Sequence, residues 1–553
     1  MKIICKNTKH TKDYEFGTGL HEIIKDQKIK RTYPIIGALV DNELEELSYR
    51  IIKPHTIEFI DITHIDGMRM YFRSLYFVLM KAVKSIYKGN EIDVMIEHSV
   101  SKGYFCQLSG IDLTGQSEQV NAIKNKMLEI IKADIPFQKK EIHNTEAIEI
   151  FEKNNYHEKA LLFKQSPSLY TCIYKLGNLY DYFYGYLAPS TGYLKIFDLI
   201  PLYDGMLLKV PNRSKPNELL PFVKQDKMFD ILDEHKNWVE ILNTANVGRL
   251  NQQIINKNEG ELIKISEALH GKKIAEIADK IKHKGNVKLI LVAGPTSSGK
   301  TTFSKRLAVQ LKVAGLKPIQ ISLDNYFVNR EQTPKDENGE YDFEALEALD
   351  TKTFNENINN LKEGKTIDMP QFSFETGERY YDGTQLSADE DTVFIAEGIH
   401  ALNPELTSEI DDSIKFKVYI SALTQIGIDG HNRISTTDNR LIRRIIRDHK
   451  YRNYSVLDTL NRWESVRRGE EKNIFPFQEE ADIMFNSALL YELAVLKKHA
   501  EPLLKDVNQK EPMHAEAKRL LKLFSYFKHI NIEEEIPPTS ILREFLGEST
   551  FHY

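Results

Sequence analysis

The stretch that decides the fold reads VKLILVAGPTSSGKTT and covers residues 287–302. Residues 287–293 are nearly all apolar, which is typical of a buried strand. Residues 294–301 then match the pattern G-x-x-x-x-G-K-[ST] without deviation. Apolar residues recur through residues 303–311 with the spacing of a helix. A strand, a glycine loop and a helix in this order predict an α/β domain with a parallel sheet flanked by helices.

A loop of this kind binds the phosphates of a nucleotide. Gly294 and Gly299 let the backbone pass close to phosphates, with N–H groups pointing inward. Lys300 supplies positive charge, and the Thr301 hydroxyl can ligate Mg²⁺. A chance turn of glycine and serine is disfavoured, because a strand precedes the loop and a helix follows it. The residues expected to bind ATP are Gly294, Pro295, Thr296, Ser297, Ser298, Gly299, Lys300, Thr301 and Thr302.

Two other predicted strands, residues 393–396 and 318–323, are each followed by an acid. The carboxyl ends of parallel strands lie at the edge of the sheet that carries the phosphate loop. We therefore expect Glu397 to hold Mg²⁺ together with Thr301, and Asp324 to accept the proton of an acceptor hydroxyl. Taken alone, each acid is also compatible with a solvent-facing strand end or a helix cap.

A cluster of arginines lies on one predicted helix. Its members are Arg440, Arg443, Arg444 and Arg447. The spacing i, i+3, i+4, i+7 puts them on one helical face, with apolar residues on the other. Four like charges repel each other unless an anion lies nearby, and a phosphate in transfer is such an anion. A solvated helix face is the alternative interpretation.

Read in order, these motifs resemble the uridine kinase and phosphoribulokinase family over about residues 287–500. Besides the phosphate loop, the resemblance rests on SLDNYF (322–327), YDF (341–343), MPQFSF (369–374) and EGIHAL (397–402). It implies a kinase that uses ATP and Mg²⁺, with Asp324, Lys300, Arg443, Arg444 and Arg447 as catalytic residues and the arginine helix as a lid. It also implies an acceptor pocket of Tyr326, Tyr341, Asp342, Phe372, Phe374 and Arg440, in which Asp342 faces ribose hydroxyls.

The acceptor pocket departs from the family pattern at two positions. Pyrimidine kinases of the family carry a base-reading histidine shortly after the aromatic pair, where this chain has Gly377. Where they carry a glutamine after the lid, this chain has Asp458. Phe372 and Phe374 share one face of an extended segment, and without the resemblance they would be read as plain core. The identity of the base is therefore left open.

The N-terminal half resembles two parts of threonyl-tRNA synthetase. Residues 1–60 are similar to its ubiquitin-like TGS module, and residues 61–225 are similar to its editing domain. The editing site of that family carries H-x-x-x-H, whereas this chain has Arg73 and Phe77 at those positions. The later cysteine and histidine pair is also missing near residues 178–184. The resemblance therefore implies an α+β region without deacylase chemistry, which binds RNA or a small effector instead.

The expected organisation has five parts. They are the TGS-like module (1–60), the degenerate editing-like domain (61–225), a helical connector (226–285), the P-loop nucleoside kinase domain (286–500) and a C-terminal helical extension (501–553). This architecture resembles a group of bacterial proteins labelled nucleoside or uridine kinase. The tail segment 540–547 looks characteristic of that group, but its sequence predicts no chemical role.

Composition narrows the class of protein further. The formal net charge of −6 argues against broad, charge-driven binding to nucleic acid, although a local basic patch is compatible with it. Three widely spaced cysteines form no CxxC pair and suit a reducing cytosol. No apolar run is long enough for a signal peptide or a membrane span, so we expect a cytoplasmic protein. The sequence leaves a homo-oligomeric state open.

The sequence favours an ATP-dependent kinase that phosphorylates the 5′-hydroxyl of a nucleoside such as uridine or cytidine. One alternative is an RNA- or ribosome-binding protein in which the phosphate loop acts as a nucleotide switch. Another is a kinase for a different small alcohol. Asp324 and the aromatic pair favour a kinase over a switch, since a switch needs no acceptor pocket.

Overall fold

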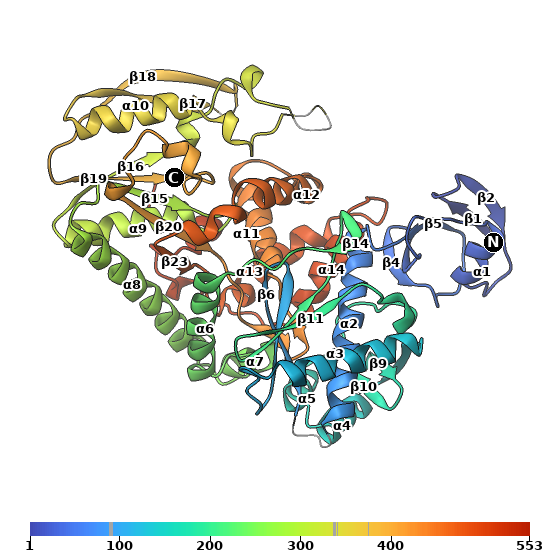
Figure 1. Ribbon diagram of the computed structural model, residues 1–553. Coiled ribbons are helices and arrows are strands. Elements are labelled where there is room, and N and C mark those ends of the chain that lie inside the picture. The colour runs from blue at the N-terminus through green and yellow to red at the C-terminus, as the bar shows by residue number, and fades with distance from the viewer. Residues whose placement is uncertain (88–91, 336–338, 340, 374, 553) are drawn as a thin grey trace.

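The computed structural model describes residues 1–87, 92–335, 339, 341–373 and 375–552. Figure 1 shows a small N-terminal module at one end of the molecule and an α/β layer at the other, with the remaining elements between them. None of the described helices combines the length and the apolar character that a bilayer span requires.

Residues 1–60 form a small sheet with one helix. The strand order is β2-β1-β5-β3-β4, and β1 runs parallel to β5. The buried strand β3 leads into a turn at Asp41 and Asn42, where both residues have positive φ, as a tight hairpin turn requires. The elements are β1 (Lys2–Cys5), β2 (His10–Asp13), α1 (Leu20–Asp26), β3 (Gly37–Val40), β4 (Glu43–Glu46) and β5 (His55–Ile60).

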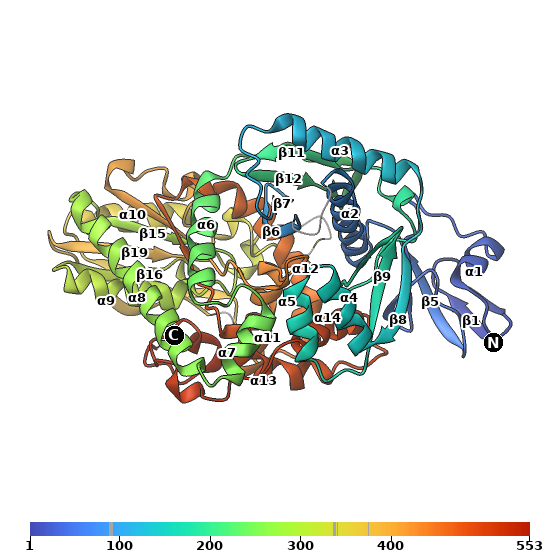
Figure 2. The same ribbon diagram turned by 90° about the horizontal axis from the view of Figure 1, so that it is seen from below.

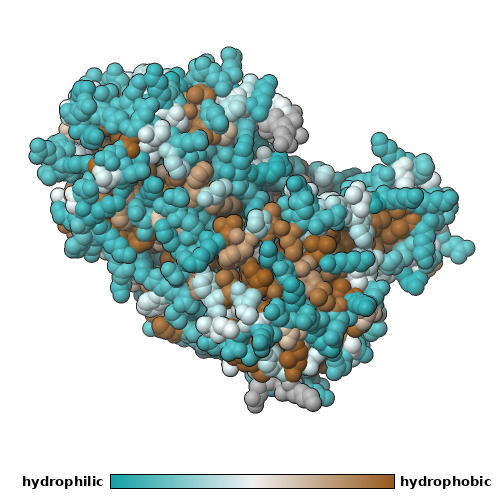
Figure 3. Space-filling view, viewed as in Figure 1, coloured by the Kyte–Doolittle hydropathy of each residue, from teal (hydrophilic) through white to brown (hydrophobic). Residues whose placement is uncertain are grey.

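Residues 61–225 are built around the long helix α2 (Ile65–Ile86), whose side chains supply much of a second apolar core. Figure 2 shows α2 between two antiparallel sheets, of order β11-β12-β7-β6 and β10-β9-β8. Figure 3 shows apolar side chains gathered over α2 and β11, whereas the viewed face of the α/β layer is mainly hydrophilic. The other elements are β6 (Val94–Val100), β7 (Gly103–Leu108), α3 (Ser117–Lys132), β8 (Gln138–His143), α4 (Asn144–Lys153), α5 (His157–Lys164), β9 (Tyr170–Leu176), β10 (Leu179–Asp181), β11 (Asp198–Leu202), β12 (Gly205–Lys209), β13 (Pro211–Asn212) and β14 (Lys215–Leu219).

The predicted helical connector consists of α6 (Asp226–Ile241), α7 (Val247–Ile255) and α8 (Glu259–Lys284). Helix α8 ends at Gly285, whose φ of 78° lies in the left-handed region that favours glycine at helix ends. Apolar residues of α8 pack in the same core as those of the helix after the phosphate loop, so the connector forms part of the α/β layer.

A parallel sheet of order β16-β19-β15-β20-β23 forms the centre of residues 286–500. Ile290 of the middle strand packs in one core with Phe303, and Leu291 packs in another core with Phe354. Helices therefore cover both faces (Figure 1), and the predicted α/β fold is confirmed. The elements are β15 (Leu289–Ala293), α9 (Lys300–Val313), β16 (Lys317–Ser322), α10 (Thr351–Lys362), β19 (Thr392–Glu397), β20 (Lys415–Ser421) and β23 (Ile483–Asn486).

Helix α11, which carries the predicted lid arginines, and the helical tail complete the molecule. Helix α14 links distant parts of the chain, because its Glu516 pairs with Arg69 of α2 and its Arg519 pairs with Asp438 at the start of α11. The elements are β17 (Ile367–Ser373), β18 (Glu378–Leu386), β21 (Gly427–Asp429), β22 (Asn432–Arg433), α11 (Thr436–Tyr451), α12 (Val456–Asn473), α13 (Glu492–Lys505), α14 (His514–Ser525) and α15 (Arg543–Leu546).

Candidate active site

The phosphate loop turns sharply from β15 into α9. A Cβ atom on Gly294 would lie 2.1 Å from the carbonyl oxygen of Ile420 on the neighbouring strand, so no side chain fits there. Gly299 caps α9 with a φ of 83°, and Ser297 also has a positive φ, of 58°. The loop thus has the close-turning backbone that a phosphate cradle needs.

Two arginines of α11 hold the outside of this loop. Arg440 donates a 3.0 Å hydrogen bond to the carbonyl oxygen of Thr296 and pairs with Glu470. Arg443 donates to the carbonyl oxygen of Ser297 and pairs with the buried Glu492. Both guanidinium groups are at most 2% exposed. Carboxylates of this chain therefore bind both arginines, and the arginines in turn stabilise the loop through hydrogen bonds to its carbonyl oxygens.

The carboxyl edge of the sheet brings the predicted metal-binding pair together. Glu397 is the last residue of β19, and Thr301 lies in the first turn of α9. The Thr301 hydroxyl donates a 3.1 Å hydrogen bond to Oε1 of Glu397. A hydroxyl and a carboxylate are the hard oxygen donors that Mg²⁺ prefers, so this pair fits that ion.

Three carboxyl groups share the field of Lys300. Asp324 lies at an exposed position on this edge, yet the protein groups around it raise its pKa by reducing solvation, and the charges of Lys300, Arg452 and Arg447 oppose that shift. Burial likewise raises the pKa of Glu397 to about 7, again against Lys300. The charge of Lys300 therefore acts both on Asp324, the candidate base after β16, and on Glu397, the candidate metal ligand at the end of β19. This is the arrangement expected of a phosphoryl-transfer site.

Glu344 is a third carboxyl in this field, and the sequence reasoning missed it. Burial and the nearby Glu470 raise its pKa to about 7, against the charges of Arg444 and Lys300. The neighbouring Asp342, which the family resemblance placed in the acceptor pocket, accepts a 3.1 Å hydrogen bond from the backbone N–H of Glu344 through one oxygen. The only signal for Glu344 in the sequence was its position two residues after Asp342, a predicted pocket residue.

The four predicted lid arginines divide into two pairs. Arg440 and Arg443 support the phosphate loop through hydrogen bonds to its carbonyl oxygens. Arg444 and Arg447 both bond to Asp448 and are more exposed, at 13% of each side chain. Arg444 also approaches the Thr296 hydroxyl at 3.4 Å. The second pair therefore lies on the side of α11 that faces the carboxyl cluster.

The predicted acceptor residues lie in different surroundings. Tyr326 is fully buried and packs edge-on against Phe354 in the core. Tyr341 is 38% exposed, and Phe372 is half-buried with its ring centroid 5.4 Å from that of Phe327. Phe374 lies outside the described residues. Of the three described aromatic residues, Tyr341 and Phe372 are the ones that a ligand can reach.

The two departures from the family pattern have structural counterparts. Gly377 has a φ of 77°, and a Cβ atom there would meet the guanidinium of Arg330 at 2.6 Å. Arg330 therefore fills the space beside the position where relatives carry a histidine. Asp458 forms a capping box with Ser455 at the start of α12, so its carboxylate has a local structural role.

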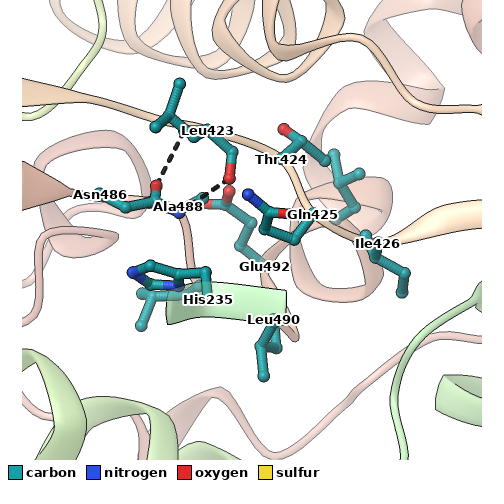
Figure 4. A pocket seen from close by; sticks show the side chains of 11 residues that line it. His235, Leu423, Thr424, Gln425, Ile426, Asn486, Ala488, Leu490 and Glu492 are labelled. Carbon is teal, nitrogen blue, oxygen red and sulfur yellow. Dashed lines mark hydrogen bonds between the residues drawn. The ribbon is translucent and has the colours of Figure 1, made fainter. Parts of the chain in front are cut away.

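Two small cavities lie away from this cluster, beside α6. Figure 4 shows the first, where His235 stands near Asn486, Gln425 and Glu492. It measures about 10 Å³, which is room for a single water molecule. Because Glu492 also pairs with Arg443, the cavity lies behind the arginine that supports the phosphate loop. It is too small for a nucleoside.

In the editing-like region, Arg73 and Phe77 stand at the two positions of the H-x-x-x-H pattern, and both side chains are packed in the protein interior. Arg73 is 4% exposed and donates a 2.7 Å hydrogen bond to the carbonyl oxygen of Tyr186. A Cβ atom on Gly185 would lie 2.1 Å from that guanidinium. Phe77 is fully buried, with its ring 5.2 Å from that of Phe183. Neither residue offers a metal ligand.

Comparison with known proteins supports both halves of this description. Residues 289–491 match the family described as "Phosphoribulokinase / Uridine kinase family". The N-terminal half is similar to threonine--tRNA ligase of Thermotoga neapolitana, at 29% identity over 189 residues, which is 34% of this chain and 29% of that protein. The corresponding enzyme of Clostridium kluyveri is 28% identical over 203 residues, which is 36% of this chain and 31% of that protein. The chain thus spans less than a third of these relatives.

A solved structure described as a possible uridine kinase from Bacillus stearothermophilus shares 17% sequence identity. The match covers 39% of this chain and 98% of that chain, with a TM-score of 0.27. The family match supports a P-loop kinase domain over residues 289–491, and both resemblances stated from the sequence are confirmed.

Proposed function

We propose that this chain transfers the γ-phosphoryl group of ATP to the 5′-hydroxyl of a nucleoside. One observation carries the proposal: the Thr301 hydroxyl of the phosphate loop donates a 3.1 Å hydrogen bond to Oε1 of Glu397, at the sheet edge where Asp324 follows β16. A phosphate cradle, a base and a metal ligand at one sheet edge are the parts that phosphoryl transfer requires.

The residues at this edge fit both ATP and Mg²⁺. Gly294 and Gly299 let the backbone turn tightly against Ile420 and Ile541, where no side chain would fit, and Thr301 and Glu397 offer oxygen ligands. Thr301 and Glu397 would hold Mg²⁺, which would supply positive charge to offset part of the phosphate charge. Lys300 would contribute its positive charge to the β- and γ-phosphates. The chain's own share of the work is to hold the phosphates and to align the acceptor.

The chemistry that we propose needs one base and several cations. Asp324 accepts the proton of the acceptor hydroxyl as its oxygen attacks the γ-phosphorus. The bond between the γ-phosphorus and the bridging oxygen breaks, and ADP leaves. Lys300, Arg444 and Arg447 stabilise the negative charge that spreads over the transferring group. In this proposal Arg443 and Arg440 contribute by keeping the loop in shape, through their bonds to Ser297 and Thr296.

For the acceptor, we propose a ribonucleoside of the uridine or cytidine type. Tyr341 and Phe372 would contact it, and Glu344 or Asp342 would bond the ribose hydroxyls. A different small alcohol is the second candidate, because Arg330 stands beside Gly377 and Asp458 is used as a helix cap. Neither position then offers the base contacts of the pyrimidine kinases.

An acceptor screen tests the proposal directly. The full-length protein is incubated with ATP and Mg²⁺ and with a panel of ribonucleosides, deoxyribonucleosides and small alcohols, and ADP formation is measured. We expect ADP formation to depend on a ribonucleoside, with a nucleoside 5′-monophosphate as product. Turnover with none of the nucleosides would contradict the nucleoside kinase proposal, and turnover with another alcohol would favour the second candidate.

The N-terminal half favours an additional binding role for RNA or a small effector. Its similarity to threonine--tRNA ligase is the observation behind this proposal. The side chains of Lys139 and Lys522 form a basic patch, and the charges of Lys139 and of the buried Arg73 both act on Lys522. Burial first, and then these charges, lowers the pKa of Lys522 to about 8. Filter binding of tRNA to the wild type and to Lys522→Glu would test whether this patch contacts RNA.

A further inference from the structure

The C-terminal tail, residues 540–547, lies directly against the phosphate loop. A Cβ atom on Gly299 would stand 2.4 Å from Cγ2 of Ile541, so the tail touches the turn that leads into α9. The segment is more than 240 residues away in the sequence, and Ile541 is fully buried there. The tail therefore forms one wall of the proposed nucleotide site.

A carboxylate of this tail bonds to the first turn of α9. Oε2 of Glu544 accepts a hydrogen bond from the Thr302 hydroxyl at 2.7 Å and from the Thr302 backbone N–H at 3.3 Å. Arg543, the cation next to Glu544 in the tail, pairs with Glu548. The negative charge of Glu544 is stabilised instead by the N-terminal end of the helix.

The same backbone N–H is needed for nucleotide binding. In loops of this pattern the N–H groups at the start of the helix bind the α- and β-phosphates. A carboxylate oxygen and a phosphate oxygen cannot both occupy the space in front of Thr302. The two anions would also repel each other at that distance. Glu544 therefore occupies the place of an α-phosphate oxygen.

The tail is held in this position from several sides. The Phe545 ring lies 5.1 Å from the guanidinium carbon of Arg443, and Lys450 of α11 donates to the carbonyl oxygen of Leu546. Ser540 bonds to the buried Glu267 of α8. The tail thus packs between the phosphate loop and the lid helix, and its backbone is anchored while the Glu544 side chain remains half-buried.

We propose that Glu544 is an internal competitor of the nucleotide, so that the tail holds the phosphate site in an autoinhibited state. This inference rests on the proposed function, because it concerns the same nucleotide site. ATP binds only to molecules in which the Glu544 carboxylate has left Thr302. The apparent affinity for ATP is then reduced by the fraction of molecules with an open site.

The test is equilibrium binding of ATP with Mg²⁺ to the full-length protein by titration calorimetry. We expect Glu544→Ala to bind ATP about tenfold more tightly, as it would if about a tenth of the wild-type molecules had an open site. Glu544→Gln keeps the size and an acceptor oxygen but loses the charge, so its gain should be smaller. Glu548→Ala is the matched control, because Glu548 pairs with Arg543, is 83% exposed and lies one residue beyond the tail.

Each outcome decides the inference. Tighter binding by both Glu544 variants, with Glu548→Ala equal to the wild type, supports internal competition. If the wild type binds ATP and Glu544→Ala binds it equally or more weakly, Glu544 does not compete, and the inference fails while the nucleotide site stands. If neither the wild type nor Glu544→Ala binds ATP, the proposed nucleotide site fails as well. Thermal unfolding of each variant shows whether the tail remains folded.

Discussion

The hydroxyl of Thr301 donates a 3.1 Å hydrogen bond to Oε1 of Glu397, and this contact joins the phosphate loop to the end of β19. The two residues are far apart in the sequence, yet both stand at the carboxyl edge of the sheet, next to Lys300. Their oxygen atoms are the ligands that we assign to Mg²⁺. We therefore expect the metal ion and the terminal phosphates to bind beside this contact.

Replacing Glu397 should weaken the use of the metal. Glu397→Gln keeps the shape of the side chain but removes the negative charge that attracts a divalent cation. We expect the Mg²⁺ concentration at half-maximal activity to rise by roughly 10- to 100-fold, the scale seen when groups around a metal are lost. Activity is measured against Mg²⁺ concentration at fixed ATP. An unchanged Mg²⁺ dependence would show that another residue holds the ion.

Lys300→Ala should abolish most phosphoryl transfer. Its charge acts on the transferring group, and donors that act at this stage contribute about 3–4 kcal/mol to transition-state stabilisation. Steady-state kinetics at saturating ATP provide the measurement. Lys312→Ala is the control, because Lys312 lies in the last turn of the same helix, away from the loop. A near-normal kcat for Lys300→Ala would rule out the assigned cradle.

Asp324→Asn should separate catalysis from nucleotide binding. The amide cannot accept a proton, so kcat should fall by roughly 10²–10⁴-fold, the usual contribution of a general base. ATP affinity should change little, because the phosphate loop provides it. The measurements are acceptor-dependent ADP formation and ATP binding. If Asp324→Asn keeps its turnover, the kinase proposal survives and only the assignment of the base fails.

Some features could be predicted because their signal is local. The strands around residues 289–293 and 392–397 show up as apolar runs, and the phosphate loop is a contiguous motif. The division of the lid arginines could not be predicted in this way. Spacing puts Arg440 and Arg443 on the same helical face as Arg444, but Glu470 and Glu492 engage them from distant segments.

Other features depend on contacts between remote parts of the chain. The sequence singles out the tail 540–547 but contains nothing that pairs Glu544 with Thr302. Similarly, a pattern of residue types cannot tell that Asp342 bonds to the backbone, whereas Glu344 faces Lys300. These contacts depend on how the elements pack in three dimensions, so they can be seen only in the assembled structure.

The interface between the editing-like region and the kinase domain should be sensitive to pH. His431 is buried among Asp93, Asp181, Asp429, Lys159 and Tyr156. Burial disfavours its charged form, but the carboxylates of Asp93 and Asp181 overcome this and raise the pKa of His431 to about 9. Because the folded pKa exceeds the unfolded value of about 6.5, the stabilisation is complete below pH 6.5 and is lost as pH rises through 9.

The corresponding measurement is the thermal unfolding midpoint between pH 6 and pH 9.5. We expect the midpoint of the wild type to fall by several degrees over this range, since each pKa unit is worth about 1.4 kcal/mol. His431→Ala should be less stable at pH 6 and should show a flatter pH dependence. His283→Ala, at an exposed position in α8, serves as the control. Identical slopes in the wild type and His431→Ala would contradict the prediction.

The editing-like region should neither hold stoichiometric zinc nor hydrolyse mischarged threonine tRNA. Zinc needs nitrogen, sulfur or carboxylate ligands, whereas Arg73 bonds to the carbonyl oxygen of Tyr186 and Phe77 packs against Phe183. Among the described residues, no three His, Cys, Asp or Glu side chains are arranged so that they could hold a metal ion. Metal analysis of the full-length protein and a deacylation assay provide the measurements. One zinc ion per chain together with release of the amino acid would overturn the prediction. If zinc is bound but no amino acid is released, only the prediction about the metal is wrong. Arg73 would still fill the space beside Gly185 that a substrate would need.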